Sequence, residues 1–210
     1  MRRMTYSGRL TWGLVFWVAS FAAWGQSELL VKVKPANKAL KANVEGYIGS
    51  LGDRDEDALL RFSRGAEEQA RKAAQALGYY QAQIDTEVKP ASDADHPPQL
   101  IISINPGEPI RLRNVTVRIE GPATELKSFR VPDSAALRPG ERLNHGLYED
   151  AKRLIQNQAS RYGFFKGRFT SQRLAVDPQA GVADIELVYQ SGPRFQLGAV
   201  HFAGDTPLDQ

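Results

Sequence analysis

Short segments in which apolar and polar residues alternate are separated by two segments with helical spacing. Leu29, Val31 and Val33 share one face of the first alternating segment, which predicts a strand. Asn37 is suited to cap the first helix, and Gly78 to end the second. The predicted order is β-α-α-β-β. Its elements are a strand over 29–34, helices over about 37–51 and 55–77, and strands over 84–88 and 100–104.

This pattern repeats at a constant offset of 85 residues. Gly78-Tyr79-Tyr80 recurs as Gly163-Phe164-Phe165, and residues 100–104 recur as 185–189. A fixed offset over nearly forty positions indicates two homologous units. The second unit and the start of a third are predicted as a strand over 110–119, a short helix over 124–130, a long helix from Asn144 to Gly163, strands over 169–176 and 182–189, and a strand over 194–203.

The predicted fold class is α+β, built from tandem modules that each pack two helices on one face of a three-stranded sheet. Short linkers rich in proline and glycine join the units, so we expect articulated modules and not freely tethered ones. The predicted organisation is a signal peptide over 1–25, a first module over 27–106, a second over 107–191 and the start of a third over 192–210.

The first 25 residues have the composition of a secretory signal. Three arginines precede an apolar run that ends in Ala23-Trp24-Gly25, which predicts export and cleavage after Gly25. An uncleaved membrane anchor is the alternative, although the run is shorter than the ~20 residues of a spanning helix. Without this segment, Lys and Arg fall from 27 to 24 against 24 Asp and Glu. A formally neutral chain argues against nucleic acid as a partner.

No pattern along the chain predicts catalysis or a bound cofactor. There is no cysteine, and His96, His145 and His201 form no pair at metal-binding spacing. Asp53, Asp55 and Asp57 resemble the start of a calcium loop, but Ala58 and Arg64 occupy the positions of its glycine and its last ligand. We therefore expect a protein that is not an enzyme and holds no metal ion or cofactor.

Binding through an edge of the first sheet is the remaining possibility. Unpaired backbone groups at a sheet edge can accept an added strand, with little demand on its side chains. The charged side chains among the candidates would limit indiscriminate pairing, and the alternative is that both edges are inert. The candidate edge residues are Leu29, Val31, Lys32, Val33 and Lys34 in the first strand and Ile84, Asp85, Thr86, Glu87 and Val88 in the second.

The repeated aromatic pair has two interpretations. Tyr79-Tyr80 and Phe164-Phe165 could bind a peptide. The pattern favours a structural role, in which the aromatic residues fix each long helix to its sheet.

Four segments together resemble the tandem POTRA domains of TamA-like outer-membrane assembly proteins. They are Leu137 to Glu149, Gly163-Phe164-Phe165, Gly192 to Phe195 and Val200 to Gly204. The resemblance implies a periplasmic scaffold, tethered to the outer membrane, that takes part in the assembly of autotransporters and other outer-membrane proteins. It also implies a TamB-like partner anchored in the inner membrane, unfolded outer-membrane proteins as clients, and a C-terminal barrel outside the residues given. Alternatives are the POTRA region of a two-partner secretion pore and a cell-division POTRA protein anchored in the inner membrane.

Overall fold

The computed structural model describes residues 26–93, 96–196 and 198–199. Within them the chain is α+β, with two three-stranded sheets, three α-helices and one short 3-10 helix. The fold class predicted from the sequence is confirmed. No helix in this part of the chain combines the length and the apolar character needed to cross a membrane.

The first module follows the predicted order. Its elements are β1 (Glu28–Val33), α1 (Lys38–Ile48), α2 (Glu56–Ala76), β2 (Gln83–Lys89) and β3 (Gln99–Asn105). The strand order is β1-β3-β2, with β1 parallel and β2 antiparallel to the central β3. Leu100 and Ile102 of β3 are fully buried beneath the helices, against Leu40 of α1 and Leu59 of α2 in one apolar core. Apolar alternation in the strands and helical spacing in α1 and α2 thus produce one shared core.

Local capping sets the helix ends. The Asn37 side chain accepts a hydrogen bond from the Leu40 N–H at 3.0 Å, which satisfies a free donor in the first turn of α1. Asp55 does the same for α2. At the end of α2, Gly78 has a φ of 85°, and the Tyr79 N–H returns to the Ala74 carbonyl at 2.9 Å. This is a Schellman ending, which needs a left-handed residue and therefore favours glycine.

The second module contains β4 (Arg111–Glu120), η1 (Pro122–Glu125), α3 (His145–Arg161), β5 (Arg168–Asp177) and β6 (Val182–Gln190). Its strand order, β4-β6-β5, repeats that of the first sheet. The short α-helix predicted over 124–130 is wrong: η1 is a four-residue 3-10 helix, and the chain then runs through turns to α3. Pro132 and Pro139 keep the chain from continuing as a helix beyond this point, because each lacks an N–H group and disfavours a helical conformation in the residue before it.

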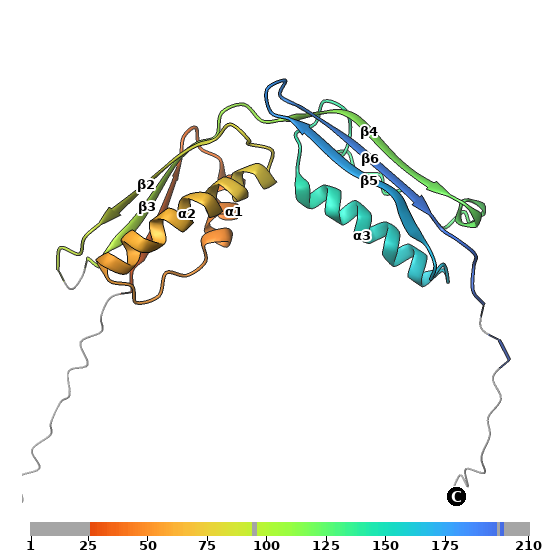
Figure 1. Ribbon diagram of the computed structural model, residues 1–210, viewed down its shortest axis with the longest axis horizontal. Helices are drawn as coiled ribbons and strands as arrows, with labels where there is room; N and C mark the ends of the chain where they lie inside the picture. Colours follow the sequence, from red (N-terminus) through yellow and green to blue (C-terminus); the bar gives the residue numbers. More distant parts are fainter. Residues whose placement is uncertain (1–25, 94–95, 197, 200–210) are drawn as a thin grey trace, which may run out of the picture.

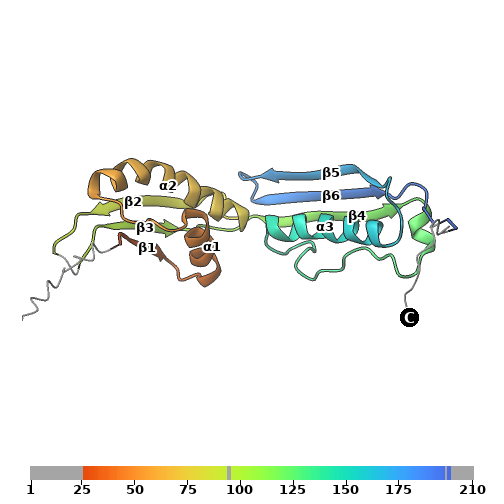
Figure 2. The same cartoon turned by 90° about the horizontal axis from the view of Figure 1, so that it is seen from below.

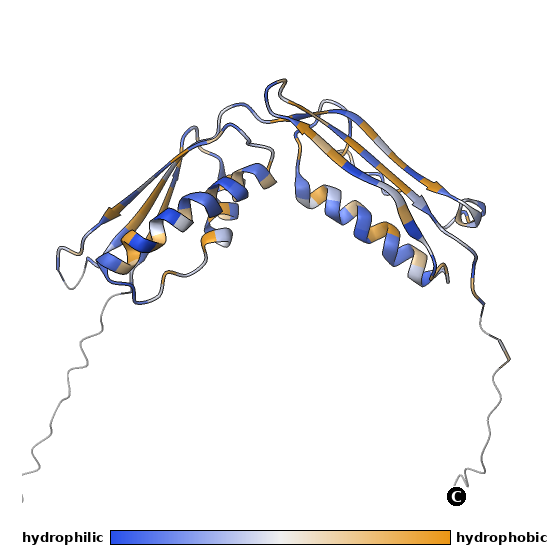
Figure 3. Ribbon diagram, in the orientation of Figure 1, coloured by the Kyte–Doolittle hydropathy of each residue, from blue (hydrophilic) through white to orange (hydrophobic). Residues whose placement is uncertain are grey.

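The two modules lie end to end as an arch, with α2 and α3 on its inner side and the sheets on its outer side (Figure 1). Viewed at a right angle, the modules lie along one line (Figure 2). Apolar bands run along the strands of both sheets (Figure 3). The predicted boundary at 106–107 falls between β3 and β4.

Two predicted segments fall partly or wholly outside the described residues. The signal peptide over 1–25 lies outside them. Of the strand predicted over 194–203, which would open a third module, the described residues 194–196, 198 and 199 are not in a strand. The rest of that segment lies outside the described residues.

Candidate interaction surfaces

All ten candidate residues lie on or directly beside the edge strands of the first sheet. β1 and β2 flank β3, so each strand exposes one edge. Nine of the ten lie within β1 and β2, and Lys34 directly follows β1. The sheet order therefore leaves both predicted edges as possible docking strands.

Hydrogen bonding in the sheet determines which backbone groups of β2 face outward. The Ile104 carbonyl accepts the Lys34 N–H at 2.9 Å, so even-numbered residues of β3 direct their backbone groups toward β1. Odd-numbered residues of β3 therefore face β2, where odd-numbered residues oppose them. It follows that the backbone N–H and C=O groups of Ile84, Thr86 and Val88 point away from the sheet. Within the described residues, these groups have no backbone partner beyond the sheet.

The edge of β1 is partly covered at its beginning. The Ser27 backbone N–H donates to the Gly52 carbonyl at 3.1 Å, and the Ser27 hydroxyl donates to the same oxygen at 2.6 Å. The Arg54 N–H in turn donates to that hydroxyl. The loop after α1 therefore lies against the start of β1. Within residues 26–93, 96–196 and 198–199, no comparable backbone contact covers the outer edge of β2.

The face of the first sheet that points away from the helices carries opposite charges at its two edges. Lys32 on β1 and Asp85 on β2 both lie opposite Ser103 of β3. Lys32, Lys34 and Asp85 line a shallow depression of about 370 Å³ with residues of β3. These charged side chains lie along the two edges and are exposed to solvent.

The junction between the modules is built from the residues that follow α2. The Ile110 N–H donates to the Gly78 carbonyl at 2.8 Å, and the Leu143 N–H donates to the Ile110 carbonyl at 2.8 Å. The Gln81 amide donates to the Pro178 carbonyl in the β5–β6 turn at 2.8 Å. One backbone bond and one side-chain bond thus connect the end of α2 to two separate parts of the second module, and Ile110 in turn is bonded to Leu143.

The two adjacent tyrosines have different roles. Tyr79 is buried in the first core, and its hydroxyl accepts hydrogen bonds from Asn37 at 2.8 Å and from Arg142 of the second module at 2.9 Å. Tyr80 packs against the core of the second module and bonds His145 Nε2 at 2.8 Å. The structural interpretation of the aromatic pair therefore holds for Tyr79, while Tyr80 belongs to the junction.

Burial at the junction changes the protonation behaviour of this pair. Removal from water lowers the pKa of His145, against the opposing effect of the nearby Glu149 carboxylate. Burial also raises the pKa of Tyr80. Both groups therefore favour their neutral forms, in which the tyrosine hydroxyl can donate to the imidazole. In the sequence, nothing marks His145 as a junction residue except its place directly after Asn144, at the start of a predicted helix.

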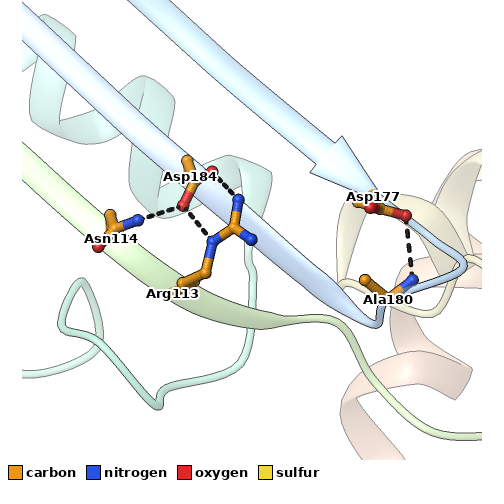
Figure 4. A network of polar contacts seen from close by, with 5 residues as sticks. All are labelled: Arg113, Asn114, Asp177, Ala180 and Asp184. Carbon is orange, nitrogen blue, oxygen red and sulfur yellow. Dashed lines mark hydrogen bonds and ion pairs between the residues drawn. The ribbon is translucent and has the colours of Figure 1, made fainter.

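An electrostatic cluster fixes the bulge in β4. Arg113 lies at a register shift between β4 and β6, and both Arg113 and Asn114 donate to Asp184 of β6 (Figure 4). Hydrogen bonding from Arg113, helped by Asn114, lowers the pKa of Asp184 to about 2. In the adjacent β5–β6 turn, Asp177 accepts the Ala180 N–H at 3.0 Å. Arg113 and Asp184 form an ion pair within the module, and Asp177 accepts backbone N–H groups of its own turn, which indicates a structural role.

The histidines are not gathered at one site. His96 lies in the β2–β3 loop beside Asp93, His145 lies at the junction, and His201 is outside the described residues. Across residues 26–93, 96–196 and 198–199, no three His, Cys, Asp or Glu side chains are placed to hold a metal ion together.

Residues 30–106 match the family described as POTRA domain TamA domain 1. The match spans β1 to β3 and confirms the resemblance to TamA-like POTRA proteins noted in the sequence.

Three solved structures are distantly similar to the chain. BamA POTRA3-5 of Haemophilus influenzae is 17% identical with a TM-score of 0.44, over 87% of this chain and 72% of that chain. POTRA1-3 of Omp85 from Anabaena is 14% identical with a TM-score of 0.35, over 78% and 59%. The N-terminal domain of Omp85 from Thermosynechococcus elongatus is 20% identical with a TM-score of 0.36, over 76% and 60%. The chain spans less than two thirds of the last two structures. The resemblance to TamA-like POTRA proteins rests on the match over residues 30–106.

Proposed function

We propose that this chain is the periplasmic POTRA region of a TamA-like outer-membrane assembly protein. It binds partner or client polypeptides during the assembly of autotransporters and other outer-membrane proteins, without catalysis of its own. The family match over residues 30–106 and the β-α-α-β-β order of the first module support this function. The export signal predicted over residues 1–25 supports a periplasmic location.

The open edge of β2 is the observation that carries the proposal. Ile84, Thr86 and Val88 direct their backbone groups outward at alternate positions, which is the arrangement that an added strand pairs with. Backbone pairing reads the extended conformation of the guest more than its sequence. A protein that meets many unfolded clients, or an extended segment of a TamB-like partner, needs this kind of recognition.

The side chains of β2 are of the kinds that limit unwanted strand pairing at a sheet edge. Asp85 and Glu87 point to the solvent face of the sheet, and charge on an edge strand reduces pairing between copies of the same chain. Ile84 and Val88 pack toward the core, so they hold β2 in place while its backbone stays accessible. We propose β2 as the docking strand, in preference to β1.

Thr86→Pro tests this proposal. Proline removes the outward N–H group and places its ring in the path of an added strand, and it is tolerated on an edge strand whose N–H faces solvent. Loss of one hydrogen bond at about 0.5–1.5 kcal/mol, with added crowding, predicts about tenfold weaker binding of the TamB-like partner's periplasmic segment. Titration calorimetry with the folded chain measures this.

Two variants serve as controls. Thr86→Val keeps the backbone N–H and should bind as the original chain does. Val33→Pro removes an outward N–H from β1 and should also leave binding unchanged, once circular dichroism shows that it is folded. Equal binding by Thr86→Pro and Thr86→Val would exclude β2, and a loss confined to Val33→Pro would assign docking to β1.

A further inference from the structure

One face of the first sheet points away from the helices and carries charged side chains in rows that cross the strands. Leu100 and Ile102 of β3 are buried on the helix side, so the residues between and beside them point to the opposite face. The same alternation applies to β1 and β2, which pair with β3 in register. We refer to three rows on this side of the sheet as the outer face. The rows are Glu28, Gln99 and Lys89; Leu30, Ile101 and Glu87; and Lys32, Ser103 and Asp85.

Two of these rows have opposite charges at their ends. Glu28 on β1 and Lys89 on β2 end the first row, and Lys32 and Asp85 end the third. Two strand spacings, about 10 Å, separate the ends of a row. Lys32 and Asp85 lie on two sides of a depression and form no ion pair with each other in the described part of the chain. Glu28 accepts a hydrogen bond from the Gln99 amide at 2.6 Å, which leaves its charge uncompensated. The charges of the outer face are therefore available to groups outside the chain.

This pattern of charges is complementary to itself about a two-fold axis that runs along β3. When two copies place their outer faces together about that axis, each row meets the same row of the other copy with its ends exchanged. Glu28 then faces Lys89 of the second copy, Lys32 faces Asp85, and each pair occurs twice. Ile101 meets its own counterpart on the axis. Stacked sheets lie about 10 Å apart, a separation that side chains of this length can span. The outer face thus has the self-complementarity that an interface between two identical chains requires.

A two-fold axis across the strands fits the charges less well. It would also pair opposite charges between the first and third rows, but it places Glu87 against its own copy. Like charges in contact across an interface are unfavourable. With the axis along β3, Glu87 instead faces Leu30 of the second copy. The order of the rows therefore favours two copies whose strands run in the same direction.

We propose that the outer face of the first sheet binds a second copy of this chain, in a two-fold dimer with parallel strands. The outer face lies on the outer side of the arch (Figure 1), so the helices of both copies stay uncovered. The outward backbone groups of β2 also stay free, because they point along the plane of the sheet and not away from it. The dimer goes beyond the proposed function and does not depend on partner binding at β2.

Association through the outer face should be weak and sensitive to salt. Ile101 is only 2% exposed in the single chain, so little additional apolar surface is buried at the centre of the contact. The ion pairs lie near the edges of a small interface, where each contributes little and salt screens it. We expect a dissociation constant in the high micromolar to millimolar range, which increases several-fold between about 0.02 M and about 0.3 M salt.

An exchange of two charges tests the proposal, by sedimentation equilibrium of the secreted chain that the sequence predicts to begin at Gln26. Lys32→Asp and Asp85→Lys each place like charges opposite one another in the dimer, so each variant should associate with itself about tenfold more weakly. An equimolar mixture of the two variants restores opposite charges at both positions. Its dissociation constant should return to within about twofold of that of the original chain. Lys38→Asp makes the same change of charge on α1, on the helix side of the sheet, and should have no effect.

The same measurement can overturn the proposal. Equal self-association by the original chain and by Lys32→Asp would do so, as would no self-association at about 1 mM in low salt. A mixture that associates no better than the single variants would exclude the parallel arrangement. Loss of association in Thr86→Pro, with no effect of the charge changes, would assign the contact to the edge of β2. Association that neither salt nor the charge changes alter would assign it to an apolar surface, such as Phe165 and Phe195, which are 69% and 44% exposed.

Discussion

Gly78 shows how one residue can satisfy two modules. Its positive φ ends α2, and the sequence pattern predicts this part of its role. A Cβ atom at Gly78 would also lie 2.5 Å from the Leu143 carbonyl oxygen of the second module. The second requirement cannot be read from local sequence, because Leu143 lies far along the chain. Only the folded junction brings the two backbones together.

Gly78→Ala should therefore cost more than a substitution at another glycine of similar conformation. Gly140 has a φ of 90° and open space around its Cβ position, so Gly140→Ala should lose only the strain of a positive φ, about 1 kcal/mol. Gly78→Ala should exceed this and should also reduce hydrogen-exchange protection at Leu143. Urea denaturation gives the free energies of unfolding. If both variants lost the same free energy of unfolding and the Leu143 amide stayed protected, the junction would be shown to rearrange without loss of stability.

The sequence predicts a structural role for Tyr79 and Tyr80 but does not predict which module each side chain contacts. The repeat identifies both as structural, but it treats the neighbours as equivalent. After the Schellman turn, Tyr79 packs back onto its own module while Tyr80 points to the next one. The partner of Tyr80 is His145, which is 65 residues away, and no local pattern connects the two.

At the scale of elements, the sequence predicts well where the determinants are local. Asn37 and Asn144 are the observed caps of α1 and α3, and the six strands seen within the described residues form where alternation predicts them. Prediction fails between η1 and α3, where no period is present. There the Gly140 N–H donates to the Leu112 carbonyl at 2.7 Å, so contacts with β4 determine the path of the segment.

The two asparagine caps should respond differently to the same substitution. Serine can still cap a helix, so Asn144→Ser should change the free energy of unfolding by less than about 0.5 kcal/mol. Asn37→Ser also loses the amide that donates to the Tyr79 hydroxyl, which predicts about 1 kcal/mol more. Thermal or urea denaturation measures both. In a Tyr79→Phe background this additional loss of stability for Asn37→Ser should disappear. If it persisted, the Asn37 amide would stabilise the protein through a contact other than the Tyr79 hydroxyl.

At the scale of the whole molecule, the junction determines the arch. Tyr79, Tyr80 and Gln81 of the first module contact Arg142, His145 and Pro178 of the second. Short linkers predict modules that are articulated and not freely tethered, and the observed contacts add a specific geometry to that expectation. The sequence could not show it, because these contacts join segments that become neighbours only once both modules have folded.

The junction should loosen in acid because of His145. Burial lowers its pKa in the folded protein below the unfolded value of about 6.5, so the unfolded or opened form takes up the proton first as the pH falls. The contribution of His145 is therefore complete above about pH 6.5 and decreases below it. The chain has no cysteine, so Lys72→Cys on α2 and Arg153→Cys on α3 provide unique sites for spin labels.

Pulsed electron paramagnetic resonance should give a narrow distribution of distances between these labels at about pH 7.5 and a broader one at about pH 5. His145→Gln retains a hydrogen-bonding side chain at the Tyr80 hydroxyl but does not titrate, so its distribution should be the same at both pH values. His96 is exposed and lies in the β2–β3 loop, away from the junction. It is present with and without the His145→Gln substitution, so any difference between the two labelled proteins is due to His145. Equal broadening in the His145→Gln variant would show that another group controls the response to acid.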